Sequence, residues 1–235
     1  MEVSGGVATA PDLEEARGSG ARVHPRFLEG LMPSPRLVAL SLLMVFAACS
    51  APTPGKLWEE SADFDAFMAD VEFRLDSWQA NYAADLPADL LERAQAVDGS
   101  WRILAVTEDW CSDSANTMPF LAHLASEVEG LEFRVVSRAF GASLMAAHPT
   151  PDGREAIPTV VLLDSDGDEV GAWVERPAEL QEWWIENPDG LGEEEQVEQK
   201  IAWYTEDGGA TTLAEVVDLL EKAEADALTC AAEGG

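Results

Sequence analysis

The sequence predicts an α/β fold in which a central mixed sheet of about four strands is flanked by helices. Three short runs indicate strands, at residues 102–107, 131–137 and 159–163, and the apolar run at 102–107 reads as the central one. The turn DSDGD and a fourth strand at 169–174 follow the third run, so these two strands form a hairpin. Helical patterns separate and flank these strands, which predicts layers of helices over the sheet.

The elements before the sheet are predicted to be an N-terminal helical pair, at residues 57–99. From 57 to about 80, apolar residues recur mostly at steps of three and four, with Ser61 as a possible N-cap. Pro87 then begins a second, short helix that ends at Asp98-Gly99. We expect both helices to pack on the domain that follows, at residues 100–228.

Helices are also predicted within and after that domain. The helix at 112–128 has Gly130 as its terminator. Further helices are expected at 140–147, 176–184, 193–204 and 212–228. Residues 229–235 are then a short tail that contains Cys230.

The N-terminal residues predict export. Residues 1–31 have no periodicity, and Met32 offers a second start, so the first segment is expected to be an upstream extension. Residues 32–48 contain a short positive region and an apolar run, which is typical of a secretory signal. The run ends in FAAC, which resembles the bacterial lipoprotein processing site and predicts lipidation of Cys49, with 49–56 as a tether. The alternative is an ordinary signal peptide cleaved near Ala48.

The formal net charge of −31 limits the classes of partner. A surface of this sign repels nucleic acid, so no nucleic-acid partner is predicted. The charge fits either an organism that lives in salt or a GC-rich genome. No cofactor or metal site is predicted, because the sequence has no Gly-rich phosphate loop and the three aspartates at 164, 166 and 168 are better explained by the hairpin turn.

Four ordered features resemble the thioredoxin family. Trp110-Cys111 stands at a strand-to-helix turn, Pro119 lies eight residues later, Ile157-Pro158 precedes a strand, and a hairpin follows. EDWCSDS, GREAIP and GAWVERPAELQ are similar to a bacterial branch of this family with WCGDA or WCxDS motifs, over about residues 100–225. The resemblance implies a three-layer thioredoxin-like fold and a site made of Cys111 with Trp110, Ile157 and Pro158.

Two positions depart from the family pattern. Ser114 replaces the second redox cysteine, and Ala105 stands where thioredoxins carry a buried aspartate. A cysteine at a helix N-terminus often has a lowered pKa. The neighbouring carboxylates of Glu108, Asp109 and Asp113 oppose a thiolate, so we expect a thiol of near-ordinary acidity.

Two functions stay open at this point. In the first, Cys111 makes mixed disulfides with envelope proteins or low-molecular-weight thiols, as a monothiol oxidoreductase of the cell envelope. Ser114 then hydrogen-bonds the sulfur, Asp113 is a candidate acid or base, and an outside thiol or Cys230 resolves the adduct. In the second, the fold is a non-catalytic binding or scaffold protein that pairs with partner backbone at Ile157.

Overall fold

The computed structural model describes residues 51–187 and 192–233. The predicted upstream extension (1–31), the signal segment (32–48) and Cys49 lie outside the described residues. Within the part described, no helix combines the length and apolarity that crossing a bilayer requires.

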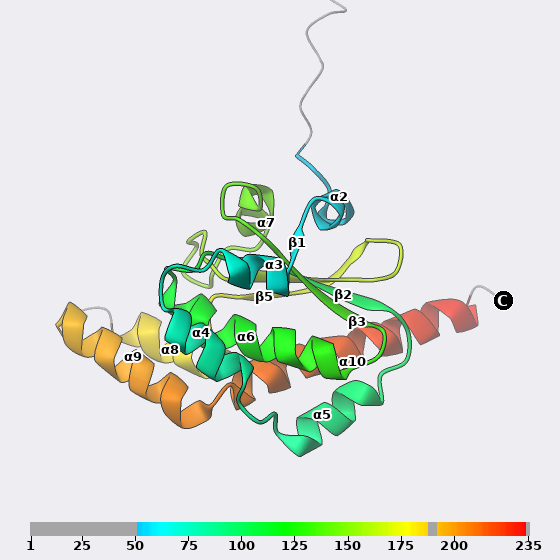
Figure 1. Cartoon of the computed structure of the whole chain (residues 1–235). Coiled ribbons are helices and arrows are strands. Elements are labelled where there is room, and N and C mark those ends of the chain that lie inside the picture. Colours follow the sequence, from blue (N-terminus) through cyan, green and yellow to red (C-terminus); the bar gives the residue numbers. More distant parts are fainter. Residues whose placement is uncertain (1–50, 188–191, 234–235) are drawn as a thin grey trace, which may run out of the picture. The chain divides into compact units, whose positions relative to one another are not determined.

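A five-stranded mixed sheet forms the centre of the fold, in the order β1-β3-β2-β4-β5 (Figure 1). Its strands are β1 (Ala62–Asp63), β2 (Trp101–Val106), β3 (Leu131–Val136), β4 (Thr159–Leu163) and β5 (Glu169–Val174). β2 pairs in parallel with β3, whereas β4 is antiparallel to both β2 and β5. The four predicted strands are therefore present in a mixed sheet, and β1 is a short addition that pairs antiparallel with β3.

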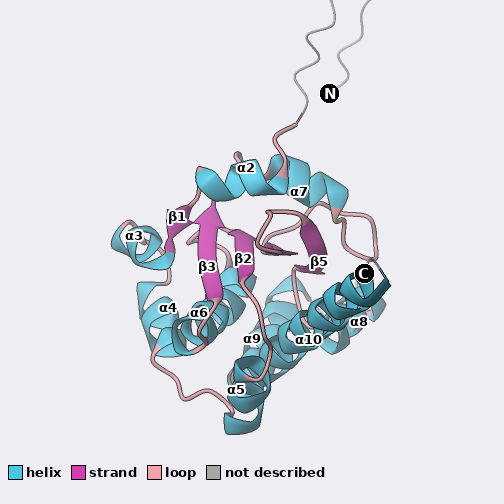
Figure 2. Ribbon diagram, turned by 90° about the vertical axis from the view of Figure 1, so that its right-hand side faces the viewer, coloured by secondary structure: helices cyan, strands magenta, loops and turns pink. Residues whose placement is uncertain are grey.

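Alternating side chains of β2 build two separate cores. Ile103 and Ala105 belong to one cluster of buried residues, and Leu104 and Val106 belong to the other, as the alternation of side chains along a strand requires. Figure 2 shows α2 (Pro54–Glu59) and α7 (Ala142–Ala147) on one face of the sheet. Helices α6 (Ser112–Glu127) and α10 (Ala210–Glu233) cover the other face. Both faces of β2 and β4 are covered, which explains why their sequences are mostly apolar, whereas β3 keeps an exposed Glu132.

The N-terminal extension differs from the predicted helical pair. Residues 54–82 form α2, β1, α3 (Phe64–Ala69) and α4 (Leu75–Tyr82), and α5 (Ala88–Gln95) follows. The helical pattern of 57–80 is broken because Asp63, not Ser61, caps a helix: its carboxylate accepts the Ala66 N–H at 2.8 Å. A second break lies at Arg74, whose φ of 55° is left-handed. Periodicity detected the apolar face but not these two interruptions.

The last two helices are longer than predicted, and the helix before them begins and ends two residues later than predicted. The three helices are α8 (Ala178–Glu186), α9 (Glu193–Asp207) and α10. The predicted tail at 229–235 is wrong in part, because α10 continues to Glu233 and includes Cys230. The hairpin turn is as expected: Asp164 Oδ1 accepts the N–H groups of Asp166 and Asp168, both at 2.9 Å.

Candidate functional site

The turn from β2 into α6 is held by the N-terminal extension. Asp109 Oδ2 accepts the N–H groups of Glu72 at 2.9 Å and Phe73 at 3.0 Å. The indole of Trp78 donates to the Asp109 carbonyl at 3.1 Å, and Arg74 Nε donates to the Trp110 carbonyl at 3.0 Å. The α3–α4 segment therefore fixes the backbone from which the Cys111 side chain projects.

Cys111 is the N-cap residue of α6. Its Sγ accepts the Ser114 backbone N–H at 3.5 Å, a position that other helices fill with a serine or aspartate oxygen. On the other side, the thiol donates to the Ile157 carbonyl at 3.4 Å. The Ile157-Pro158 peptide bond is cis. The sulfur thus lies between a helix N-terminus and the loop before β4, as the resemblance implied.

The thiol is nearly covered, while its neighbour is open to solvent. Cys111 is 8% exposed and belongs to the core cluster of the α2 and α7 face, together with Ile157. Trp110 is 49% exposed. The side chain that precedes Cys111 in the sequence is therefore open to solvent, while the thiol itself is mostly enclosed.

Asp113 forms the centre of a buried group of charges beside Cys111. Its Oδ1 accepts from Arg176 Nε at 3.2 Å and from the Tyr204 hydroxyl at 2.9 Å. Its Oδ2 accepts from Lys200 Nζ at 2.9 Å, and Lys200 also donates to the Ser112 hydroxyl at 3.0 Å. Asp113, Arg176, Lys200 and Tyr204 are all buried. We call these four residues the Asp113 cluster.

A second buried carboxylate balances the cluster. Glu175 accepts from Arg176 Nη2 at 2.8 Å and is held from outside by two hydrogen bonds from Arg154. The indole ring of Trp184 lies 4.3 Å from the Arg176 guanidinium and 5.2 Å from Lys200 Nζ. Two buried anions therefore face two buried cations, with an aromatic ring against both cations.

Burial is the main influence on Cys111, and it raises the pKa of the thiol. The charge of Asp113 raises this pKa further, while hydrogen bonding from Ser114 opposes both effects. The expected near-ordinary acidity is therefore replaced by a weaker acid. Two of the three carboxylates expected to crowd the thiol are engaged elsewhere: Asp109 holds the α3–α4 segment, and Glu108 Oε1 accepts the Arg138 N–H at 2.7 Å.

Ser114 contacts the sulfur through its backbone. Its side chain is buried, and its N–H donates to Cys111 Sγ at 3.5 Å. Hydrogen bonding from the Ser114 side chain and backbone lowers the pKa of the thiol, against the effect of burial.

The family comparison agrees with this geometry. The family described as thioredoxin matches residues 61–195, which is more than half of the chain. The chain belongs to this thioredoxin family. Two solved structures are similar to it: a protein of unknown function from Pseudomonas aeruginosa, with a TM-score of 0.59, and an HIV epitope-scaffold protein, with a TM-score of 0.57. Each is 21% identical and covers 73% of this chain and 99% of its own, so both support the fold alone. No curated protein matches the chain.

Two members of the Asp113 cluster lie beyond the residues that the thioredoxin family matches. Lys200 and Tyr204 come from α9, 87 and 91 residues after Asp113. Sequence reasoning missed both of them, and Arg176 and Glu175 as well. One signal was available: lysine occurs only at positions 56, 200 and 222, and Lys200 stands beside Ile201, Trp203 and Tyr204 in an otherwise acidic helix.

Cys230 is not brought to the site. Glu224 lies six residues before Cys230 in α10, and its carboxylate accepts the Asp98 N–H. Asp98 precedes β2, whereas Cys111 follows β2. The end of α10 and the start of α6 lie at opposite sides of the domain in Figure 1. The predicted resolving role of Cys230 from a free tail is therefore corrected: its backbone is helical and remote from Cys111.

Proposed function

We propose that this thioredoxin-family protein performs slow thiol–disulfide exchange through the single thiol of Cys111. The observation that supports the proposal best is the position of Sγ, which lies between the N-terminus of α6 and the Ile157 carbonyl beside the exposed Trp110. Helix N–H groups stabilise a thiolate, and the loop carbonyl is a group that substrate binding can displace.

The proposed reaction has two steps. The Cys111 thiol loses its proton to solvent base, and the thiolate attacks a disulfide R–S–S–R′, so that Cys111–S–S–R forms and R′–S⁻ leaves and takes up a proton. A low-molecular-weight thiol then attacks the adduct, which returns Cys111–SH and gives a new disulfide with R. Because Cys230 is remote and Ser114 has no sulfur, the second thiol comes from outside.

Burial of Cys111, followed by the charge of Asp113, sets the expected pH dependence. The thiolate is the nucleophile, and burial and the Asp113 charge both disfavour it. We therefore expect exchange to be slow near pH 7 and to accelerate as pH rises. Asp113 itself is paired on both oxygens, which assigns it a positioning and electrostatic role in place of the general acid or base considered from the sequence.

The alternative function is non-catalytic binding of polypeptide on the same surface. The burial of Cys111 and its raised pKa favour this alternative, because they describe an unreactive thiol. Under this alternative, Trp110 and the loop at Ile157 form the contact surface and Cys111 only packs against the loop.

Adduct formation separates the two functions. The full chain with Cys49→Ala and Cys230→Ala has Cys111 as its only thiol; we call it the single-cysteine protein. Incubation with 4,4′-dithiodipyridine, a neutral disulfide, should add one pyridylthio group by intact mass, and glutathione should remove it. A further Cys111→Ala change should abolish the adduct. A folded protein that forms no adduct up to pH 9, but does so in urea, would exclude exchange and leave binding.

We also propose that the protein is exported and held at a bacterial membrane surface by lipid on Cys49. The apolar run before Cys49 and the small residues at 47 and 48 support this proposal. Radiolabelled palmitate should enter the wild-type chain and not a Cys49→Ala chain in a bacterial host. Label retained in the variant, or absent from both, would contradict lipidation at this residue.

A further inference from the structure

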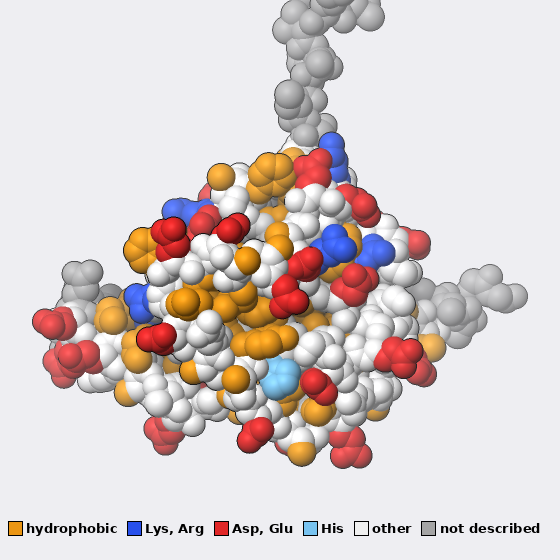
Figure 3. Space-filling view, viewed as in Figure 1, with side chains coloured by type: hydrophobic (Ala, Val, Ile, Leu, Met, Phe, Trp, Pro, Cys, Tyr) orange, Lys and Arg blue, Asp and Glu red, His pale blue; other side chains and the backbone are white. Residues whose placement is uncertain are grey.

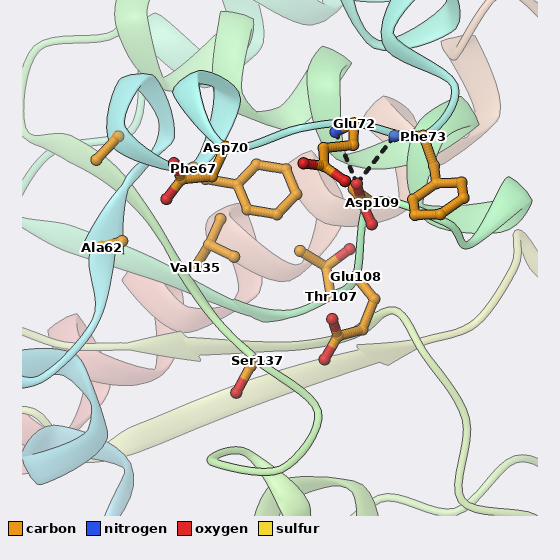
Figure 4. A pocket seen from close by; sticks show the side chains of 11 residues that line it. Ala62, Phe67, Asp70, Glu72, Phe73, Thr107, Glu108, Asp109, Val135 and Ser137 are labelled. Atoms are coloured by element: carbon orange, nitrogen blue, oxygen red, sulfur yellow. Dashed lines mark hydrogen bonds between the residues drawn. The ribbon is translucent and has the colours of Figure 1, made fainter.

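A cavity of about 440 Å³ lies at the carboxyl ends of β2 and β3, and its lining includes Asp109, two residues before Cys111 (Figure 4). One wall comes from the N-terminal extension and includes Phe67, Asp70, Glu72 and Phe73. The other wall includes Thr107, Glu108 and Asp109, which lead directly into the turn that carries Cys111. Because consecutive Cα atoms are 3.8 Å apart, the Cα atoms of Asp109 and Cys111 are at most ~7.6 Å apart.

The walls of this cavity are apolar and acidic together. Figure 4 shows Glu72 and Asp109 between the rings of Phe67 and Phe73, with Thr107 and Glu108 beyond them. Figure 3 shows apolar side chains gathered in the middle of this face, over α3 and α4, with carboxylates around them. Phe73 is 57% exposed, which leaves a large aromatic surface open to a partner.

The carboxylates of Asp70 and Glu72 have no cationic partner among the described residues. Two cations adjoin lining residues in the sequence: Arg74 follows Phe73, and Arg138 follows Ser137. Arg74 Nε is bonded to the Trp110 carbonyl, and neither arginine forms an ion pair with a described residue. The negative charges of Asp70 and Glu72 therefore remain available to a cationic ligand in the cavity.

The cavity wall that leads to Cys111 contains an unpartnered hydroxyl. Thr107 is 1% exposed, and its Oγ1 forms no hydrogen bond with a described residue. Buried hydroxyls are normally hydrogen-bonded, so an unpartnered one in a cavity wall points to a polar group that is supplied from outside. Hydroxyl and carboxylate oxygens both accept from N–H donors, so this oxygen and the carboxylates of Asp70 and Glu72 favour a ligand that carries such donors.

We infer that this cavity receives a lysine or arginine side chain of a polypeptide whose own cysteine sulfur reacts at Cys111. The aliphatic stem of such a side chain packs on Phe67 and Phe73, and its charged head meets Asp70 and Glu72. The short path from Asp109 through the exposed Trp110 to Cys111 lets one extended segment reach both places. The substrate class is then a basic polypeptide disulfide, and this inference rests on the proposed exchange at Cys111.

Peptide disulfides that differ in one charge test the inference. Short peptides carry one cysteine, activated as a pyridyl disulfide, and either arginine, the isosteric neutral citrulline or glutamate two to four residues away. The single-cysteine protein should form the arginine adduct about 3- to 10-fold faster than the citrulline adduct at low salt, which is the contribution of two exposed ion pairs. The glutamate peptide should be slowest.

Two charge-matched variants identify the place where this preference arises. Asp70→Asn with Glu72→Gln should abolish the preference for arginine over citrulline. Glu127→Gln with Glu129→Gln changes the net charge equally, at exposed positions next to the opposite end of β3, and should retain it. Equal rates for arginine and citrulline in the parent protein, or a preference that survives the first pair of changes, would overturn the inference.

Failure of the exchange proposal gives a different result. If none of the peptides forms an adduct, the Cys111→Ala protein is titrated with the same peptides carrying serine in place of cysteine. An arginine-over-citrulline ratio of dissociation constants of 3- to 10-fold, lost in Asp70→Asn with Glu72→Gln, would uphold the cavity without the chemistry. A ratio near one would reject the cavity as a site for a cationic side chain.

Discussion

At the residue scale, Cys111 and Asp113 show what local sequence can and cannot predict. The motif WCSDS and the following helix correctly placed Cys111 at an N-cap and Asp113 in the first turn. Adjacent carboxylates in the sequence suggested crowding, but Glu108 and Asp109 are turned to backbone N–H groups of other segments. Asp113 is the neighbour whose charge raises the pKa of the thiol. The direction of a side chain depends on distant donors, which neighbouring residues do not reveal.

Removal of the Asp113 charge should be strongly destabilising. Among the described residues, Asp113→Asn leaves the buried Lys200 without an ion-pair partner and leaves Arg176 with Glu175 alone, so we expect a loss of about 3–5 kcal/mol in the free energy of unfolding. Urea denaturation measures this loss. Glu129→Gln, an exposed carboxylate, should change stability by less than about 0.5 kcal/mol. A similarly small loss of stability in Asp113→Asn would show that the charge of Asp113 contributes little to the free energy of unfolding.

The raised pKa of Cys111 also predicts a dependence of stability on pH. Below about pH 8.5, the ordinary thiol value, Cys111 is protonated in the folded and unfolded chains and adds no pH dependence. Above it, the unfolded chain loses its proton first, so folding stability falls as pH rises through the folded-state pKa. Between pH 8 and 9.5 the single-cysteine protein should lose more stability than its Cys111→Ala derivative. Parallel slopes for the two proteins would contradict the raised pKa.

At the scale of elements, the joint between α9 and α10 helps to position Lys200 and Tyr204, the two members of the Asp113 cluster that α9 carries. Gly208 and Gly209 both have positive φ, 59° and 82°, and they turn the chain from α9 into α10. Lys200 and Tyr204 reach Asp113 only because α9 returns along the domain at this angle. The two glycines are visible in the sequence. The position of α9 against α6 depends on packing between helices, so the periodicity of α9 could not predict it.

The two glycines make a matched pair of tests. A Cβ at Gly209 would lie 2.5 Å from the Phe120 ring, whereas a Cβ at Gly208 would meet nothing within 4 Å. Gly208→Ala should therefore lower the free energy of unfolding only by the strain of an alanine in the left-handed conformation, ~1–2 kcal/mol. Gly209→Ala should cost a further ~1–3 kcal/mol for overpacking against α6. Chemical denaturation of both variants compares them, and equal losses would show that Phe120 moves aside freely.

At the scale of the whole molecule, the layered fold could be predicted and the site only in part. Short runs rich in apolar residues identified β2, β3 and β4, and the hairpin identified β5. The pattern at 57–80 predicts one helix, because apolar residues recur at helical spacing throughout. The structure interrupts that helix at Asp63 and Arg74, and the spacing of apolar residues does not reveal either break. In the Asp113 cluster, Asp113 is hydrogen-bonded to residues that lie 63, 87 and 91 positions later in the chain. Contacts at such separations leave no local pattern in the sequence.

The net charge of −31 belongs to this scale as well. Repulsion among exposed carboxylates opposes the compact state, and salt screens it: the Debye length falls from about 10 Å at 0.1 M to 3 Å at 1 M. We expect the urea midpoint of unfolding to rise between 0.1 and 1 M NaCl, and to rise similarly in KCl. A midpoint that stays flat or falls would mean that surface repulsion contributes little to stability.

The reactivity of Cys111 towards a neutral disulfide as a function of pH is the most direct measurement of whether this site performs exchange. In the single-cysteine protein, the rate of pyridinethione release from 4,4′-dithiodipyridine should follow the thiolate fraction, with a midpoint above about 8.5, because burial and Asp113 raise the thiol pKa. A midpoint below about 7 would contradict the weakly acidic thiol. No release from the folded protein at any pH would contradict exchange itself.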